Sequence, residues 1–294
     1  MKNRQEDLYR MEKQKLQELK ILSAKIRKDI LEMLEKRGYG HMGGSLSIVE
    51  LMSVLYGKQL RYDAKNPKWE DRDMVVLSKG HAGPAWYSAL SENGFFEREW
   101  LFTLNDGGTN LPSHPDRLKT PGVDMTTGSL GQGTSAAAGI ATGFRMKGSG
   151  QYVYLIVGDG ELNEGQCWEA FQYIAHYRLN QCIVIIDENK KQLDGATEEI
   201  MNPFSIADKM KAFGFHTQTV KGNDEEAIDA AIENAKLVKD QAVCIVLDSV
   251  KGAGVPYFEQ LDGNHSVKFN YDEILEANHK AIQDLQKFIE GGAR

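Results

Sequence analysis

The chain has 294 residues, of which 41% are hydrophobic and 26% are charged, and its formal net charge is −7. This length predicts one large α/β domain or two ordinary ones. The acidic balance argues against a nucleic-acid partner, because phosphate backbones select basic surfaces. No apolar run approaches the roughly 20 residues that cross a bilayer, and the charged N-terminus lacks a signal-peptide core, so we expect no membrane partner. The scattered cysteines Cys167, Cys182 and Cys244 favour a reduced, cytoplasmic protein.

The first predicted element is a helix over about Gln14–Arg37, where leucine and isoleucine recur mostly at helical spacing. Residues 1–13 are interpreted as a charged N-terminal extension of this helix, either frayed or available for docking. A second helix is predicted over Ser47–Leu60, with Ser47 as its N-cap and Glu50 completing a capping box.

Four short, apolar, mostly β-branched runs predict buried strands of the kind found in parallel sheets. Helical segments lie around and between them, which favours right-handed βαβ units and a doubly wound, mostly parallel α/β sheet with helices on both faces. With no repeat or linker in the sequence, we expect residues 1–294 to form a single domain. The predicted strands are Met74–Ser78, Tyr152–Val157, Cys182–Ile186 and Val243–Leu247, and the predicted helices are Thr134–Lys147, Gly165–Tyr177 and Asp224–Val238.

Polar residues follow two of these strands where each one ends. Gly158-Asp159-Gly160 follows the second strand, and Asn189 follows the third, thirty positions after Asp159. Ligands of open parallel sheets bind at the carboxyl ends of strands, and neighbouring strands lie about 5 Å apart. If the two strands are neighbours, the carboxylate and the amide oxygen can bind one Mg²⁺ together with phosphate oxygens. An ordinary turn would explain the Gly-Asp-Gly sequence alone, so the metal prediction depends on both side chains.

The glycine-rich loop Thr127–Gly133 precedes a predicted helix, so its amide N–H groups can face an anion. A rival interpretation is a dinucleotide-binding fingerprint, because Gly131, Gly133 and Ala136 match GxGxxA and Asp159 stands near the expected position of a ribose-binding acid. Two observations count against the rival. The sequence shows no convincing strand before the glycines, and the histidines described next would have no role. An NAD-binding oxidoreductase is therefore the alternative.

Four histidines lie in predicted loops that are rich in Gly, Pro and Ser. Singly, each is best interpreted as a surface residue, but four such loops beside strands or helix starts predict a cleft lined with hydrogen-bonding groups. Their spacing matches no zinc motif. These residues are His41, His81, His114 and His265.

Taken together, the motifs resemble the transketolase family of thiamine diphosphate enzymes. Gly-Asp-Gly followed by Asn189 resembles the thiamine diphosphate motif, whereas GHMGGSLS, LSKGHA, SHPD, TTGSLGQG and KGAGV…NH in this order are similar to transketolase. The resemblance covers about residues 15–270 and corresponds to the N-terminal, diphosphate-binding half, as in bacterial split transketolases. A relative of deoxyxylulose-phosphate synthase and a scaffold that no longer binds the cofactor remain further alternatives.

The resemblance implies how the cofactor is held. The side chains of Asp159 and Asn189 and the carbonyl of Lys191 would bind Mg²⁺, for which Ca²⁺ or Mn²⁺ can substitute. Lys191 stands where the family usually has Ile, a change of little consequence for a carbonyl ligand. The remaining cofactor contacts would be His81, Gly160 and His265 at the diphosphate, and the backbone of Gly128 and Leu130 near the aminopyrimidine.

The resemblance also implies catalytic roles. His41 and His114 would hydrogen-bond substrate hydroxyls, and all four loop histidines are candidates to move protons and stabilise developing alkoxides. Glu164 would lie at a subunit interface and link the carboxylates of two active sites. The implied reaction transfers a two-carbon ketol unit from a ketose phosphate, or an analogous anionic ketose such as a sulfonate, to an aldose, as in the pentose phosphate pathway.

In this family, the glutamate that activates the aminopyrimidine belongs to a second domain, which we do not find in this sequence. The resemblance therefore implies an α₂β₂ assembly with a C-terminal partner subunit that supplies the pyrimidine-binding half. We expect the chain to be inactive alone.

Overall fold

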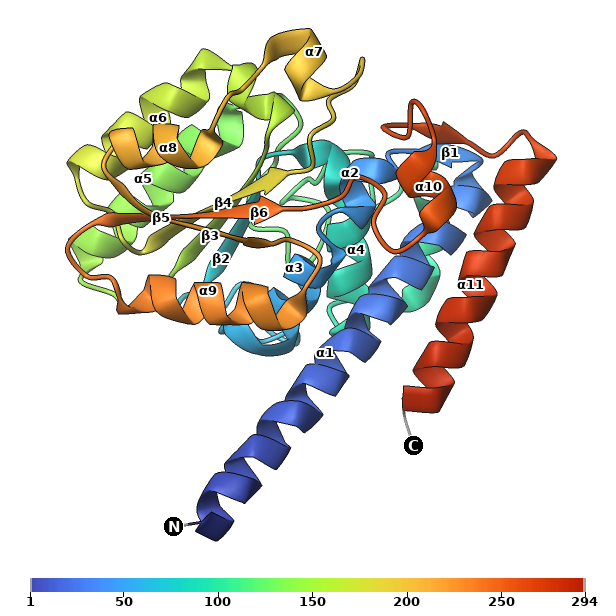
Figure 1. The fold of residues 1–294 in the computed structure, drawn as a ribbon, viewed down its shortest axis with the longest axis horizontal. Coiled ribbons are helices and arrows are strands. Elements are labelled where there is room, and N and C mark those ends of the chain that lie inside the picture. The colour runs from blue at the N-terminus through green and yellow to red at the C-terminus, as the bar shows by residue number, and fades with distance from the viewer. Residues whose placement is uncertain (1, 293–294) are drawn as a thin grey trace.

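The computed structural model describes the backbone of residues 2–292 and the side chains from residue 12 onward. Its centre is a five-stranded, wholly parallel sheet in the order β2-β3-β4-β6-β5 (Figure 1). A separate antiparallel pair joins β1 (Tyr39–Gly40) to β7 (Val267–Lys268). The predicted doubly wound α/β fold is confirmed. The main strands are β2 (Met74–Leu77), β3 (Val153–Gly158), β4 (Cys182–Glu188), β5 (Phe215–Lys221) and β6 (Ala242–Asp248).

Alternate residues of each central strand pack on opposite faces of the sheet. In β3, Tyr154 and Ile156 belong to one hydrophobic core, whereas Leu155 and Val157 belong to the other. Because both faces are covered, the strands are continuously apolar. One core contains side chains from α1 (Lys2–Arg37), α3 (Val49–Val54), α4 (Gly83–Glu92) and α9 (Glu225–Leu237), and the other from α5 (Gln132–Lys147), α6 (Gly165–His176) and α8 (Ile206–Ala212).

The shorter elements and the last helix complete the chain. The long helix α1 runs beside the C-terminal helix α11 (Figure 1). None of the helices in the described part of the chain is long and apolar enough to cross a membrane. The remaining helices are α2 (Gly43–Leu46), α7 (Thr197–Met201), α10 (Pro256–Gln260), α11 (Asp272–Gly292), the π-helix Leu55–Gln59 and the 3₁₀ turns Gly80–Ala82, Arg98–Thr103 and Gly160–Asn163.

Most of the predicted helix Ser47–Leu60 is present, as α3 followed directly by the π-helix, but the predicted capping box is wrong. Ser47 follows α2, and its side chain makes no cap bond to α3. Its hydroxyl donates to Oδ2 of buried Asp187 at 2.7 Å, while Glu50 pairs with Arg27. Two buried tertiary partners therefore take the side chains that the local motif would have used. At the other end of the chain, α1 begins at Lys2, so the expected N-terminal extension continues the helix from that residue.

Candidate active site

A cavity of about 270 Å³ opens where β2, β3 and β4 end. Gly158 of β3 is paired with Asp187 of β4, so the two strands are neighbours as the metal prediction required. Loops from distant parts of the sequence complete the walls. Every site residue predicted from the sequence except Glu164 lines this cavity: His41, His81, His114, Gly128, Leu130, Asp159, Gly160, Asn189, Lys191 and His265.

Glu164 lies apart from the other predicted residues. It is exposed at the start of α6 and is absent from the lining of the cavity. The structure therefore brings together the predicted cofactor and substrate residues but leaves Glu164 on the surface of this chain. Its interface role remains a prediction.

The four loop histidines form one cluster. The ring centroid of His41 lies 5.6 Å from that of His81, 5.8 Å from that of His114 and 5.4 Å from that of His265. Burial lowers the pKa of all four rings, and for His265 burial and then the charge of Lys251 lower it to about 4. The rings are thus neutral near pH 7 and present both hydrogen-bond donors and acceptors to the cavity.

Lys251 is a cavity residue that begins the KGAGV motif but received no role in the sequence analysis. Its Nζ donates to the carbonyls of Lys191 (3.0 Å) and Gln192 (3.1 Å) and lies 3.2 Å from Nδ1 of His265. Burial, followed by the charge of Lys79, lowers the Lys251 pKa to about 8, so the ammonium is still charged near pH 7. Because an ammonium only donates, His265 must accept at Nδ1 and carry its proton on Nε2.

The predicted metal ligands form an oxygen-rich edge of the cavity. Asp159 accepts hydrogen bonds from the backbone N–H of Gly160 (2.8 Å) and Lys190 (2.6 Å), and burial followed by the charge of Asp187 raises its pKa to about 7. The described residues contain no group of three or more His, Cys, Asp or Glu side chains that could hold a metal. One carboxylate with an amide and a carbonyl instead suits a hard cation that completes its shell with ligand oxygens and water.

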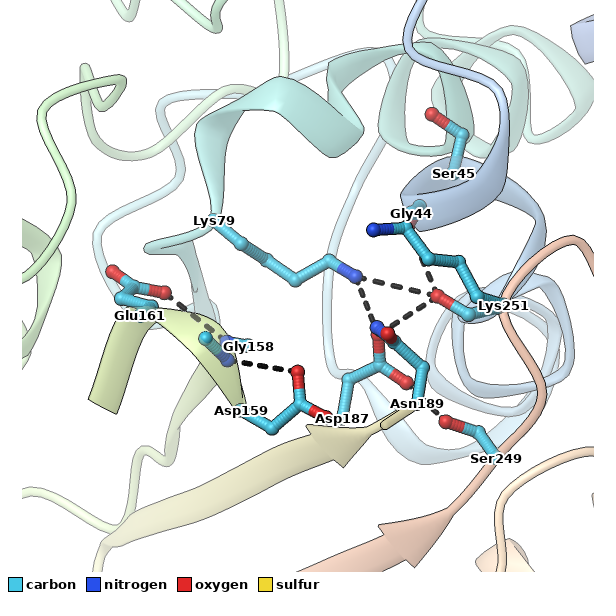
Figure 2. A network of polar contacts seen from close by, with 12 residues as sticks. Gly44, Ser45, Lys79, Gly158, Asp159, Glu161, Asp187, Asn189, Ser249 and Lys251 are labelled. Carbon is cyan, nitrogen blue, oxygen red and sulfur yellow. Dashed lines mark hydrogen bonds and ion pairs between the residues drawn. The ribbon is translucent and has the colours of Figure 1, made fainter. Parts of the chain in front are cut away.

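A buried ion pair at the wall of the cavity, between Lys79 and Asp187, was also missed. Figure 2 shows Lys79 directed at Asp187, with Asn189 beside them. Burial opposes ionisation of Asp187, but the Lys79 ammonium and hydrogen bonds from Ser249 and Asn189 outweigh it and lower the Asp187 pKa. In the sequence, Lys79 and Asp187 sit at strand ends, where charged residues are usually exposed. Only their proximity in the fold identifies them.

The dinucleotide interpretation is not favoured by the structure. No strand is present over residues 104–131 immediately before the fingerprint glycines, all of which lie in the described part of the chain. The N–H of Gly131 is taken by the side chain of Glu161 at 2.8 Å and is therefore not free to bind a phosphate. The glycine-rich loop is instead hydrogen-bonded to Glu161, in the turn that follows β3.

Residues 19–289 match the family described as "Transketolase, thiamine diphosphate binding domain". The chain is 46% identical over 263 residues to a 6-deoxy-6-sulfo-D-fructose transketolase subunit of Clostridium sp. (strain MSTE9), covering 89% of this chain and 94% of that one. It is 37% identical to an apulose-4-phosphate transketolase subunit of Actinobacillus succinogenes, covering 75% and 79%. The transketolase structure from Campylobacter jejuni superposes with a TM-score of 0.81 at 27% identity, covering 95% of this chain and 47% of that one, so this chain spans about half of it.

Proposed function

Since this chain belongs to the transketolase family, we propose that it is the cofactor-binding subunit of a thiamine diphosphate- and Mg²⁺-dependent transketolase. The observation that carries this proposal is the cavity at the ends of β2, β3 and β4, which gathers ten residues that the sequence motifs and the family resemblance had indicated. We further propose that residues 1–294 act as a single domain, and that its three buried, unpaired cysteines reflect a reducing, cytoplasmic location.

The residues present suit thiamine diphosphate. The Lys191 carbonyl already accepts a hydrogen bond from the Lys251 ammonium, so it faces a cationic partner inside the cavity. Asp159 and Asn189 would complete the protein ligands of Mg²⁺, and His81 would face diphosphate oxygens. The three donors of the Lys251 ammonium are already used by Lys191, Gln192 and His265, so Lys251 would attract the diphosphate through its charge. When bound, the cofactor supplies the nucleophilic carbon and the electron sink that cleavage of a ketose C–C bond requires.

The chain's own residues would bind the sugar and move protons. His265 presents its Nε2–H to the cavity, because Lys251 occupies Nδ1. The ring of His41 lies 5.4–5.8 Å from the other three rings, centroid to centroid, and can relay protons among His81, His114 and His265. Neutral rings can stabilise a developing alkoxide by donating, or accept a hydroxyl proton at the free nitrogen.

We propose a partner subunit that supplies the pyrimidine-binding half, in an α₂β₂ assembly. Support comes from the relatives from Clostridium and Actinobacillus succinogenes, which are similar to this chain over most of their length and are themselves described as subunits. The same names support an anionic ketose as donor, with a sulfonate favoured over a phosphate because the relative named for 6-deoxy-6-sulfo-D-fructose has the higher identity. Glu164, exposed at the start of α6, is proposed to face the interface.

Two assays test the function. In a thermal-shift measurement, thiamine diphosphate with Mg²⁺ should stabilise the chain and NAD should not, whereas the reverse result would favour the oxidoreductase. Ketol transfer from 6-deoxy-6-sulfo-D-fructose and from fructose 6-phosphate should then require both this chain and the partner. Full turnover by this chain alone would contradict the two-subunit proposal.

A further inference from the structure

The carboxylate of Glu161 lies where three walls of the cavity meet, and the proposed chemistry does not use it. Its side chain is 3% exposed and lines the cavity. Oε1 accepts hydrogen bonds from Oγ of Ser78 and from the backbone N–H of Gly131 (2.8 Å), and Oε2 accepts one from the backbone N–H of Gly158 (3.1 Å), the contact drawn in Figure 2. Glu161 belongs to the turn after β3, and its buried side chain connects this turn to two segments that are distant in sequence, one at Ser78 and the other at Gly131.

Each connected segment carries residues of the candidate site. The first follows β2, the second precedes α5, and the third is the turn after β3. A displacement of any one segment would move its cavity residues relative to the other two. These residues are Lys79 and His81 on the first segment, Gly128 and Leu130 on the second, and Asp159 and Gly160 on the third.

The first two segments are also closely packed. Gly131 has a left-handed backbone (φ 83°) at the start of α5, a conformation that side chains other than glycine rarely adopt. A Cβ at Gly133 would lie only 2.6 Å from Oγ of Ser78. The Ser78 hydroxyl is thus held between the start of α5 and the Glu161 carboxylate, and it cannot move toward α5.

We propose that Glu161 is a positioning residue that fixes the three cavity segments relative to one another and thereby sets the affinity for the cofactor. The identity of the ligand, thiamine diphosphate, rests on the proposed function. The connection between the segments rests only on the contacts of Glu161.

The substitution Glu161→Gln is a sharp test because it is nearly isosteric. Both carboxylate oxygens accept from backbone N–H groups, one from Gly131 and the other from Gly158. A backbone N–H cannot become an acceptor, so the amide NH₂ of glutamine must face a donor in either orientation. At least one connection is lost without a cavity being created.

Cofactor affinity is the first readout. With the full chain in Mg²⁺, titration calorimetry of Glu161→Gln should show thiamine diphosphate binding weakened by about tenfold or more, the range for residues that orient ligating groups. Glu169→Gln, which removes the same charge from the exposed face of α6, should bind like wild type. Ser78→Ala, which leaves the carboxylate and both N–H bonds intact, should give a smaller loss and serves as the second variant if Glu161→Gln does not fold.

Hydrogen–deuterium exchange without cofactor is the second readout. Glu161→Gln should speed exchange in segments 76–82, 127–134 and 156–161 and leave β6 unchanged. Wild-type affinity together with wild-type protection of these segments would overturn the inference, as would a lower melting temperature with unchanged affinity. If wild type fails to bind thiamine diphosphate even with the partner subunit present, the proposed function is wrong, and the exchange measurement alone then decides whether Glu161 connects the segments.

Discussion

Nζ of Lys79 lies 2.6 Å from Oδ2 of Asp187, and both side chains are essentially inaccessible to solvent. The same oxygen accepts a hydrogen bond from Nδ2 of Asn189 at 2.7 Å. Because Nδ2 is held in this way, the amide oxygen of Asn189, which accepts one hydrogen bond from the backbone N–H of Lys191 (3.2 Å), is the atom that can bind a cation with its second lone pair. The ion pair therefore orients a predicted metal ligand as well as neutralising a buried carboxylate.

Removing one member of this pair should be costly. Lys79→Met leaves Asp187 buried without a counter-charge, and we expect a loss of about 3–5 kcal/mol in the free energy of unfolding. Adding Asp187→Asn to that variant removes the stranded charge and should restore part of the stability. Urea denaturation of the two variants measures the difference. A single variant that is as stable as the double variant would contradict the proposed charge balance.

The metal prediction is tested at Asp159. Asp159→Asn keeps the size of the side chain but removes its charge, and we expect Mg²⁺-dependent binding of thiamine diphosphate to weaken by about 10- to 100-fold. Asp248→Asn is the matched control, because Asp248 ends β6, which β4 separates from β3, and pairs with Lys190 outside the cavity. Titrations with Mg²⁺, Ca²⁺ and Mn²⁺ should show the defect with each cation. Equal effects of the two substitutions would argue against a metal ligand at Asp159.

Lys251 should contribute to the binding affinity for thiamine diphosphate but little to that for thiamine. Lys251→Met removes a buried positive charge, so it should weaken thiamine diphosphate binding by about tenfold while changing thiamine binding little, since only the former carries the anion. Lys190→Met is the control, because its side chain is largely exposed and outside the cavity lining. Competitive binding of the two ligands measures the preference. Equal losses for both ligands would show that Lys251 shapes the cavity and does not bind the anion.

Sequence patterns predict the parts of this fold that depend on which residues follow one another along the chain. The four predicted strands are found because both of their faces are apolar, whereas β5 escaped notice because it is a half-exposed edge strand with the polar run His216–Thr219. Glycine and histidine in loops mark the cavity for a similar reason, since their positions beside strand ends are visible in the sequence. Lys79, Asp187 and Glu161 could not be found in this way, because their roles depend on partners brought close only by the fold.

The low pKa of the clustered histidines predicts how stability changes with pH. His265 has its pKa lowered from 6.5 to about 4 by burial and then by Lys251, so between these values the unfolded chain binds a proton at this position that the folded chain does not. The free energy of unfolding therefore falls as pH decreases through this window, with a slope of up to about one proton for this histidine. His265→Gln removes that contribution, so it should lose less stability than wild type between pH 7 and pH 5 in urea denaturation. His176→Gln, an exposed substitution at the end of α6, provides the control for a lost imidazole. Parallel stability profiles for wild type and His265→Gln would mean that the ring is protonated as readily in the cavity as in the unfolded chain.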